Sequence, residues 1–224
     1  MLSNTSDIAS TLRGFSWWDD AMAALESAYS AHGEAVRERA LEHGNKYAGR
    51  RAAMVFDVVA SRQRNYQARV LPMVEDWEQR GVSLGQLADE GPGDGLGLRK
   101  GEALTMQEVA RGLVRFATDH ELDDEVGVKT WAEAVEALAH APKLDPYVGC
   151  VKGIGPALFA YLRMRCGASA LKPDLRVGRA LRSYGFKVSD DVHELLIVSA
   201  VVADELTVSR LELDQLLWWG GPQA

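Results

Sequence analysis

Cysteine is scarce in this chain: Cys150 and Cys166 are the only two among its 224 residues. Their spacing suggests neither a disulfide scaffold nor a zinc site. The five histidines show no metal-ligand spacing and no Gly-x-Ser-x-Gly partner for nucleophilic catalysis. The sequence also lacks an N-terminal signal segment and any apolar run long enough to cross a bilayer. We therefore expect a cytoplasmic protein with no cofactor and no membrane partner.

Alternating strand patterns are likewise scarce, whereas helical periodicity recurs along most of the chain. We therefore predict an all-α protein. The clearest break is the glycine-rich segment 89–97, which lacks the spacing and the preceding strand of a phosphate-binding loop and is interpreted as an exposed loop. The expected helices span residues 17–31, 33–44, 48–61, 66–80, 105–119, 130–140, 145–151, 156–166, 175–184, 190–204 and 208–218.

Basic residues are concentrated in two segments of an otherwise acidic chain, whose net charge is −7. The segment 152–187 contains eight basic residues and one acid, Asp174, for a local charge of +7, while the 17 basic and 31 acidic residues outside it give −14. The segment 46–69 contains six basic residues and the single acid Asp57, for a local charge of +5. Two such stripes indicate one positive cleft that binds a polyanion, although solvated arginines on helix faces would give the same pattern.

Residues 151–157 read Val-Lys-Gly-Ile-Gly-Pro-Ala, a short glycine hairpin that runs into an apolar helix. Glycines on both sides of Ile154 permit a tight turn with positive φ and the close approach of a ligand backbone. Pro156 suits the first position of the helix, where its missing N–H costs nothing. The free N–H groups of the helix start predict an anion-binding site, and the alternative is an ordinary glycine turn between two helices.

The helix expected over 156–166 carries apolar residues at i, i+3 and i+4 from Leu158, so one of its faces should pack inward. Arg163 and Arg165 belong to the same helix. We expect both arginines to reach solvent or a phosphate.

Asp174 follows Gly155 by 19 residues and directly precedes the helix expected over 175–184. Aspartate is a preferred N-cap, so one interpretation of this residue is structural. The other is that its carboxylate lies beside the hairpin in a cleft and acts in catalysis. The two roles can coexist at the start of a helix.

A third motif follows this aspartate, the run Arg179-x-x-x-Ser-Tyr-Gly185. Together with Gly153-Ile154-Gly155, the apolar helix and Pro173-Asp174, it resembles the helix-hairpin-helix Gly/Pro-Asp superfamily of DNA glycosylases. The close match covers residues 145–186. Weaker similarity is found at 56–66, which resembles the family's early helix and its polar loop, and at 213–218, which resembles its C-terminal closing helix.

The resemblance implies two helical lobes that flank a DNA-binding cleft. One lobe comprises 51–167 and ends in the helix-hairpin-helix, and the other comprises 1–50 and 168–224. The implied function is base excision repair, in which the N-glycosidic bond of a flipped damaged or modified base in double-stranded DNA is hydrolysed and an abasic site remains. A monomer associated with the nucleoid is expected. The alternative is a non-catalytic helix-hairpin-helix DNA-binding protein, and a more remote one is a helical protein–protein adaptor.

The same resemblance assigns roles to individual residues. Asp174 is the implied catalytic residue, and the hairpin is implied to hold the DNA backbone through main-chain amides. A monovalent cation is implied at the backbone of Val151 and Gly153. The hairpin residues expected to contact DNA are Lys152, Gly153, Ile154, Gly155 and Ala157.

The basic stripes add further candidates for DNA binding. Arg62, Arg64 and Arg176 are expected to hold phosphates. A polar loop tip flanked by arginines can enter the base stack, so a wedge is expected among Gln63, Asn65 and Tyr66, although each also suits an exposed helix end. Trp17 or Trp18 is a candidate for stacking on the extruded base, and the alternative for both is a place over the core.

Two departures from the family pattern narrow the expected chemistry. Ala157 stands where strand-cutting members carry the lysine that forms a Schiff base with the sugar. The resemblance therefore implies a monofunctional, hydrolytic enzyme. Members with an iron–sulfur cluster carry four cysteines after the aspartate, whereas both cysteines here precede Asp174, so no such cluster can form.

Overall fold

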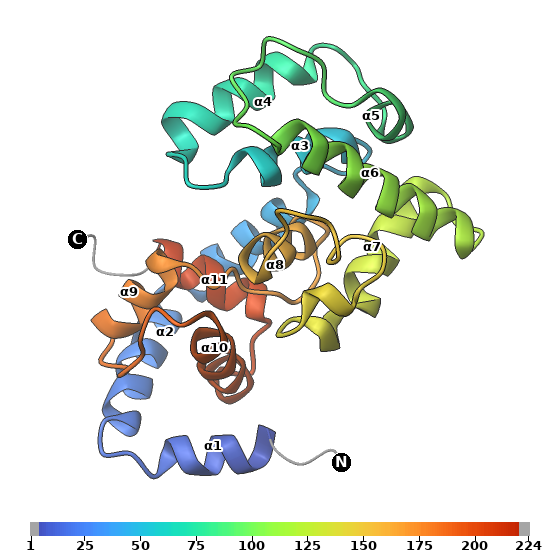
Figure 1. Ribbon diagram of the computed structural model, residues 1–224. Helices are drawn as coiled ribbons and strands as arrows, with labels where there is room; N and C mark the ends of the chain where they lie inside the picture. The colour runs from blue at the N-terminus through green and yellow to red at the C-terminus, as the bar shows by residue number, and fades with distance from the viewer. Residues whose placement is uncertain (1–4, 220–224) are drawn as a thin grey trace. The chain divides into compact units, whose positions relative to one another are not determined.

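Residues 5–219, which the computed structural model describes, form helices joined by turns and loops, with no strand in that range (Figure 1). The prediction of an all-α protein is confirmed. The chain divides into two compact units, of which the first comprises Met1–His43 and Ser169–Ala224 and the second comprises Gly44–Ala168. That these units are lobes around a DNA-binding cleft, and that the chain contains a helix-hairpin-helix motif, stay predictions.

The first unit has a mostly aliphatic core that also contains Trp18 and Phe186. The rings of Trp18 and Phe186 meet edge to face there, with centroids 5.5 Å apart. Its helices are α1 (Thr5–Arg13), α2 (Trp18–Asn45, whose last two residues belong to the second unit), α9 (Leu175–Ser183), α10 (Val192–Leu206) and α11 (Arg210–Trp219). α9 begins after Asp174, which caps it.

The second unit is assembled around two buried helices, α3 (Arg51–Ala60) and α8 (Pro156–Arg165). Every residue of α3 is buried, as is every residue of α8 from Leu158 onward. The two helices run antiparallel, because Arg51 at the start of α3 donates to the carbonyl of Arg165 at the end of α8, at 3.3 Å. The other elements are the π-helical turn η1 (Tyr66–Val70), α4 (Leu71–Glu78), α5 (Leu84–Glu90), α6 (Glu102–Asp119), α7 (Asp124–Ala134) and the 3-10 turns η2 (Glu136–Leu138) and η3 (Pro142–Leu144).

Some helix boundaries differ from those expected. The helices expected over 17–31 and 33–44 form one continuous helix, α2, in which Gly33 stays helical. A single glycine is tolerated inside a helix when its neighbours favour helix. Helices α1 and α5 were not expected from the sequence. Ser83 and Gln86 nevertheless form a capping box at the start of α5, which is a signal that sequence alone contains.

The helix expected over 145–151 is absent, and turns occupy these residues. Asp145 is fully buried, and its carboxylate accepts the backbone N–H groups of residues 147–149 at 2.8–3.1 Å. A side chain that takes these donors competes with helical hydrogen bonding. Gly149 also passes so close to Pro142 that a Cβ on it would lie 1.9 Å from the proline carbonyl oxygen. The segment before the hairpin is therefore a tightly packed turn.

An ion pair between Asp57 of α3 and Arg165 of α8 is buried in the second unit, with an N···O distance of 3.0 Å. Tyrosine hydroxyls surround it. Tyr47 donates to the Asp57 carboxylate at 2.8 Å, and Arg165 donates to the Tyr161 hydroxyl at 2.7 Å. Burial alone would lower the pKa of Arg165, but Tyr161 and Asp57 raise it. The guanidinium therefore stays charged inside the unit and joins the two central helices.

Arg163 is buried as well, and its Nε donates to the carbonyl of Ala132 at 2.7 Å. The expectation that Arg163 and Arg165 reach solvent or a phosphate is therefore wrong. Both residues lie in the part of α8 that has no solvent-facing side, and both find their partners in the protein. The local charge of the segment 152–187 accordingly overstates the positive charge that a ligand can reach.

A second ion pair fixes the start of α3. Arg51, whose side chain is 3% exposed, donates to both carboxylate oxygens of Glu125, at 2.7 and 2.6 Å. Burial alone would raise the pKa of Glu125, but hydrogen bonds from Arg51, from the Gly49 amide and from Lys129 lower it to about 2. The ionised carboxylate therefore stabilises the folded state.

We expect Arg165→Met to lower the free energy of unfolding by about 3–5 kcal/mol, because it leaves the Asp57 carboxylate buried without its counter-charge. Denaturant titration measures this loss. Lys129→Met is the matched control: it removes one positive charge from an exposed pair with Glu125 and should cost no more than about 0.5 kcal/mol. An Arg165 variant as stable as this control would show that the buried pair does not hold the unit together.

We expect Glu125→Gln to lower the free energy of unfolding by about 2 kcal/mol at neutral pH, as for other hydrogen bonds to a charged group. The folded-state pKa of about 2 lies below the unfolded value. The contribution is therefore complete above a pH of about 4.3 and is lost as the pH falls through the folded value. Unfolding titrations of the wild type and the variant should converge across this window. A difference that stays constant down to the lowest pH would contradict the assignment.

Candidate nucleic-acid interface

The glycine hairpin holds its carbonyl groups against side chains of the protein. The Val151 carbonyl accepts from the Lys143 ammonium at 2.7 Å. The Lys152 carbonyl accepts from the Thr105 hydroxyl at 3.0 Å. In a planar trans peptide the N–H points opposite to the C=O, so the amides of Lys152 and Gly153 point away from these two side chains. Neither amide has an acceptor among the described residues, and consecutive N–H groups of this kind form an anion-binding concavity.

Gly153 is required by the conformation of the hairpin. Its φ of 97° is one that other residues rarely adopt, and a Cβ there would lie 2.9 Å from the Thr105 hydroxyl oxygen. Ile154, only 1% exposed, anchors the hairpin to the core. The Cβ position built at Gly153 also lies 3.7 Å from a guanidinium nitrogen of Arg62. The exposed Arg62 side chain is therefore brought beside the hairpin, although the two are distant in the sequence.

α8 starts directly after the hairpin, with Pro156 in its first turn as expected. The first N–H that makes a helical hydrogen bond is that of Phe159, which donates to the Gly155 carbonyl at 2.9 Å. The N–H groups of Ala157 and Leu158 come before it and have no acceptor within the helix. Gly155 itself is extended, with φ −114° and ψ 180°, and a Cβ on it would meet no atom within 4 Å. Neither the backbone conformation nor the packing of the protein requires glycine at this position. A ligand that approaches the backbone closely would require it, because a side chain there would block the approach.

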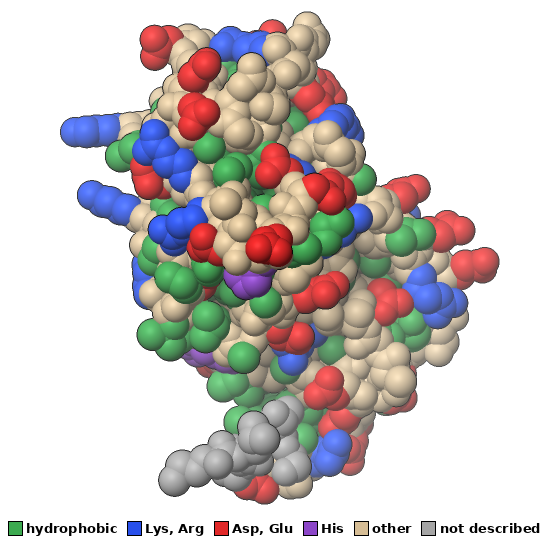
Figure 2. Space-filling model, turned by 90° about the vertical axis from the view of Figure 1, so that its right-hand side faces the viewer, with side chains coloured by type: hydrophobic (Ala, Val, Ile, Leu, Met, Phe, Trp, Pro, Cys, Tyr) green, Lys and Arg blue, Asp and Glu red, His purple; other side chains and the backbone are tan. Residues whose placement is uncertain are grey.

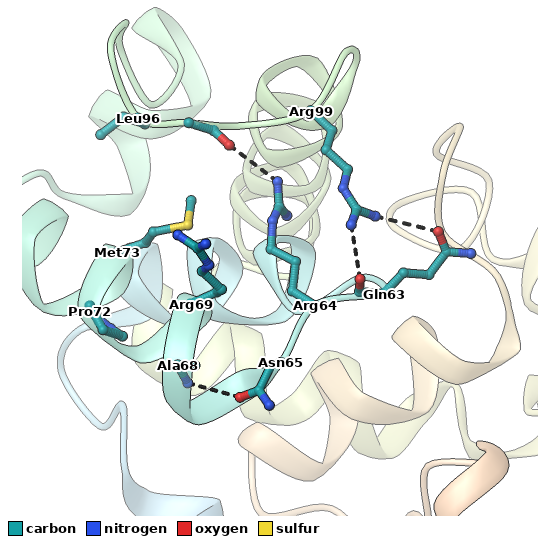
Figure 3. A pocket seen from close by; sticks show the side chains of 10 residues that line it. Gln63, Arg64, Asn65, Ala68, Arg69, Pro72, Met73, Leu96 and Arg99 are labelled. Carbon is teal, nitrogen blue, oxygen red and sulfur yellow. Dashed lines mark hydrogen bonds between the residues drawn. The ribbon is translucent and has the colours of Figure 1, made fainter.

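The loop that follows α3, residues 61–65, has Gln63 at its exposed tip (Figure 3). Gln63 adopts a φ of 52°. This left-handed conformation costs a non-glycine residue about 1–2 kcal/mol. Arg99 holds the tip in place, since its guanidinium donates to the carbonyls of Arg62 at 3.1 Å and Gln63 at 2.9 Å. A strained and firmly supported residue at an exposed tip is typical of a functional position.

Arg64 and Asn65 stabilise this loop from within. Arg64 donates to both carboxylate oxygens of Glu102, at 2.8 and 2.7 Å, and its side chain is 9% exposed. It therefore supports the loop instead of facing a phosphate, contrary to the expectation. Asn65 is exposed, and its side chain accepts the N–H of Ala68 at 2.9 Å and caps η1.

Tyr66 is tied to the interior of the unit. Its hydroxyl donates to Asp57 at 3.1 Å and accepts from Lys46 and from Arg165, each at 3.0 Å. A side chain fixed by these three partners cannot extend from the loop tip, so the interpretation of Tyr66 as a wedge is wrong. A place for its half-buried ring in a base pocket stays a prediction.

A groove with a volume of about 610 Å³ lies beside Gln63 (Figure 3). Among the described residues that line it, none is acidic. Arg69 is exposed, and its side chain extends into the groove beside Met73. Arginines and apolar side chains line the groove, namely Arg64, Arg69, Arg99, Ala68, Pro72, Met73 and Leu96.

Four exposed basic side chains of the second unit lie at the loop, the groove and the hairpin: Arg62, Arg69, Arg99 and Lys152. Other basic residues of this unit, such as Arg80, Arg111 and Lys143, are exposed as well. Figure 2 shows acidic and basic side chains interspersed over one face of the molecule. A locally positive surface on an acidic protein favours a specific polyanionic partner over general adhesion.

In the first unit, Asp174 lies at the start of α9 with its side chain 26% exposed. Its Oδ1 accepts the N–H groups of Arg176 at 2.9 Å and Val177 at 3.2 Å, which confirms the N-cap. Its Oδ2 lies 3.7 Å from the Lys172 ammonium. The carboxylate therefore has one oxygen engaged by the helix and the other facing a cation.

The loop before Asp174 is fixed by Asp214 of α11, a residue that was not expected to have a role. Asp214 is 1% exposed, and its carboxylate accepts the backbone N–H of Lys172 and the side chain of Gln215, each at 3.1 Å. α11 also contains Arg210, Glu212 and Gln215, so the local sequence does not distinguish Asp214. Lys143, Thr105 and Arg99 were also missed, and nothing in their local sequence distinguishes them.

The aromatic candidates of the first unit differ in their accessibility. Trp18 is 1% exposed, and its indole N–H donates to Glu205 at 3.2 Å. The interpretation of Trp18 as a base-stacking residue is therefore wrong, because it belongs to the core. Trp17 is half-buried, and its role stays a prediction. Arg176 is exposed, but its guanidinium lies 3.6 Å from the centre of the Trp218 ring and donates to the Trp218 carbonyl.

The chain matches no protein-family model, no curated protein and no solved structure. Among residues 5–219, no three His, Cys, Asp or Glu side chains are grouped so that they could hold a metal ion. Within the same range, no helix combines the length and the apolar character needed to span a membrane.

We expect Gln63→Gly to unfold with a free energy about 1 kcal/mol higher than Gln63→Ala, because glycine adopts a positive φ without strain whereas alanine keeps that strain. The two variants remove the same polar side chain and are matched controls for each other. Denaturant titration measures the difference. An alanine variant as stable as the glycine variant would show that the loop tip is not strained.

Proposed function

We propose that this chain is a monofunctional DNA glycosylase of the helix-hairpin-helix class. It would hydrolyse the N-glycosidic bond of a damaged or modified base in double-stranded DNA and leave an abasic site. The observation that carries the proposal is the hairpin, whose amides at Lys152 and Gly153 lack acceptors among the described residues and are followed by the open start of α8. The resemblance to DNA glycosylases at Gly153-Ile154-Gly155 and Asp174 supports the same conclusion.

The hairpin suits a phosphate of the DNA backbone. Its outward amides and the positive end of α8 favour an anion, and Gly155 leaves space for close approach. Arg62 and Lys152 add exposed positive charge at the same place. Binding of this kind is independent of base sequence and weakens as salt rises, because each phosphate contact releases condensed counterions.

Gln63 is the candidate for the residue that fills the base stack. A base inside a duplex hides its glycosidic bond, so an enzyme must extrude the base at a cost of a few kcal/mol and hold the gap open. A rigid polar tip serves this purpose, and Arg99 supplies the rigidity by holding two consecutive carbonyls. The groove beside Gln63, with Arg69 and Met73, presents charge and apolar surface to the DNA at the same point.

Asp174 is the candidate for the catalytic carboxylate. Cleavage of an N-glycosidic bond develops oxocarbenium-like positive charge on the sugar, by analogy with other glycoside hydrolyses. A fixed carboxylate stabilises this charge and orients the attacking water. The cap bonds to Arg176 and Val177 engage only Oδ1, which leaves Oδ2 for this task once Lys172 moves toward a phosphate.

Ala157 supports the hydrolytic, monofunctional mode. It occupies the position at which strand-cutting members of the family carry a nucleophilic lysine. A methyl side chain forms no Schiff base with the sugar. The product would therefore be an uncut strand that contains an abasic site and breaks only on later treatment with alkali or heat.

One observation favours the alternative of a DNA-binding protein without turnover. The Asp174 carboxylate is engaged by the helix cap on one side and faces the Lys172 ammonium on the other, and this arrangement is also that of a purely structural cap. Activity separates the two candidates, because the binder retains the hairpin and its affinity for DNA but releases no base.

We expect Asp174→Asn to lower the single-turnover rate of base excision by at least about 100-fold while duplex affinity stays within about twofold, because the amide keeps the cap and loses the charge. The assay is abasic-site formation on duplexes with alkylated, deaminated, oxidised or mismatched bases. Asp190→Asn is the matched control, since it removes the same charge from an exposed pair with Arg182 in the same unit.

Each outcome of this assay decides between the candidates. Full activity of Asp174→Asn would exclude the catalytic assignment. Salt-dependent duplex binding by the wild type without abasic sites on any duplex would establish the non-catalytic binder. No duplex binding at low salt would leave the protein–protein adaptor.

A further inference from the structure

The carbonyl side of the hairpin already carries a positive charge from the protein. The Lys143 ammonium lies 2.7 Å from the Val151 carbonyl oxygen and 3.4 Å from that of Cys150. Lys143 belongs to η3, the short turn before the hairpin. The ammonium thus bridges two consecutive carbonyls. The Lys152 amide belongs to the Val151 peptide and therefore points away from the ammonium.

The resemblance to DNA glycosylases implies a monovalent cation at the backbone of Val151 and Gly153, and the described residues do not fit one. A carbonyl oxygen has two lone pairs. Those of Val151 are engaged by the Lys143 ammonium and by the N–H of Ile154, at 2.7 and 3.2 Å. A metal ion at the same oxygen would displace one of these donors and would lie within a few ångströms of a second positive charge, which repels it.

The position of Lys143 is determined by the packing around it. Gly149 passes Pro142 at a distance that leaves no room for a Cβ, and the buried Asp145 carboxylate binds the amides of residues 147–149. These contacts fix η3 against the segment that leads into the hairpin. The backbone at Lys143 is therefore already fixed, and only the lysine side chain has to become ordered when its ammonium binds the carbonyls.

We propose that Lys143 is a tethered cation that takes the place of an exchangeable monovalent ion in this hairpin. It positions the Val151 peptide so that the next amide faces a phosphate, and it is a positioning residue because it lies on the carbonyl side of that peptide. That the ligand is a phosphate rests on the proposed function. That the hairpin holds no exchangeable ion does not depend on the proposed function.

The experiment compares duplex binding in potassium, sodium, lithium and N-methylglucamine chlorides at one ionic strength, by fluorescence anisotropy with a labelled duplex. We expect wild-type affinity to be independent of the cation within about twofold. Lys143→Met should bind about tenfold more weakly in N-methylglucamine, the loss expected for a charged hydrogen bond. Potassium or sodium should restore part of this loss, because a small ion can then occupy the vacated carbonyls, and Lys143→Arg should retain most of the affinity. Lys129→Met, which removes an equal charge on α7, should behave as wild type.

Three results would overturn the proposal. The first is a wild type that binds DNA only with a particular cation, and the second is a Lys143→Met variant with wild-type affinity. The third is a Lys143→Met variant whose duplex affinity falls equally in every salt, which would mean that Lys143 contributes only its charge.

A readout without DNA separates this proposal from the proposed function. In amide NMR spectra, potassium should leave the Lys152 and Gly153 resonances of the wild type unchanged and should shift those of Lys143→Met. This pattern with no duplex binding in any salt would support the tethered cation and reject the glycosylase. A wild type whose resonances shift with potassium would reject the tethered cation, and this test stands even where the variant does not fold.

Discussion

The buried ion pair between Asp57 and Arg165 is the interaction on which the second unit depends. It joins α3 to α8, the two helices with almost no solvent-facing surface. Tyrosine hydroxyls contact Asp57 Oδ2 and the Arg165 guanidinium, whereas Asp57 Oδ1 and Arg165 Nε are buried and make no hydrogen bond within the described residues. A charge pair of this kind adds little net stability, but removing one partner strongly destabilises the folded state because the other charge stays buried. It therefore fixes one relative placement of the two helices.

This placement determines the candidate interface. Because α3 and α8 run antiparallel, the end of α3 and the start of α8 lie at the same end of the pair, and Arg62 meets Gly153 there. The loop tip and the hairpin are thus presented together by buried helices, which suits a site that must keep its shape while it distorts a ligand. The hairpin adds a second level of order, since Lys143 and Thr105 hold its carbonyls and thereby turn its amides outward.

The parts of the fold that sequence predicted well are those with local causes. α8 begins at Pro156 and α9 follows the Asp174 cap, because a proline in the first turn and an aspartate N-cap act within one turn of helix. The helix expected over 145–151 failed because its hydrogen-bonding groups are taken by the Asp145 carboxylate and because Gly149 lies against Pro142. Periodicity does not reveal such contacts, since a tight turn rich in apolar residues has the same pattern as a short helix.

The sequence by itself determined the all-helical class, the hairpin with its glycines and the aspartate at a helix start, because each of these follows from the preferences of neighbouring residues. Only the tertiary structure decided which charges face water. Arg163 and Arg165 were expected to be accessible and are buried, whereas Lys143 and Arg99 carry no motif and yet hold the hairpin and the loop. The physical reason is that burial of a charged side chain depends on partners that the fold brings together from distant segments. A charge stays buried only where such partners pair with it.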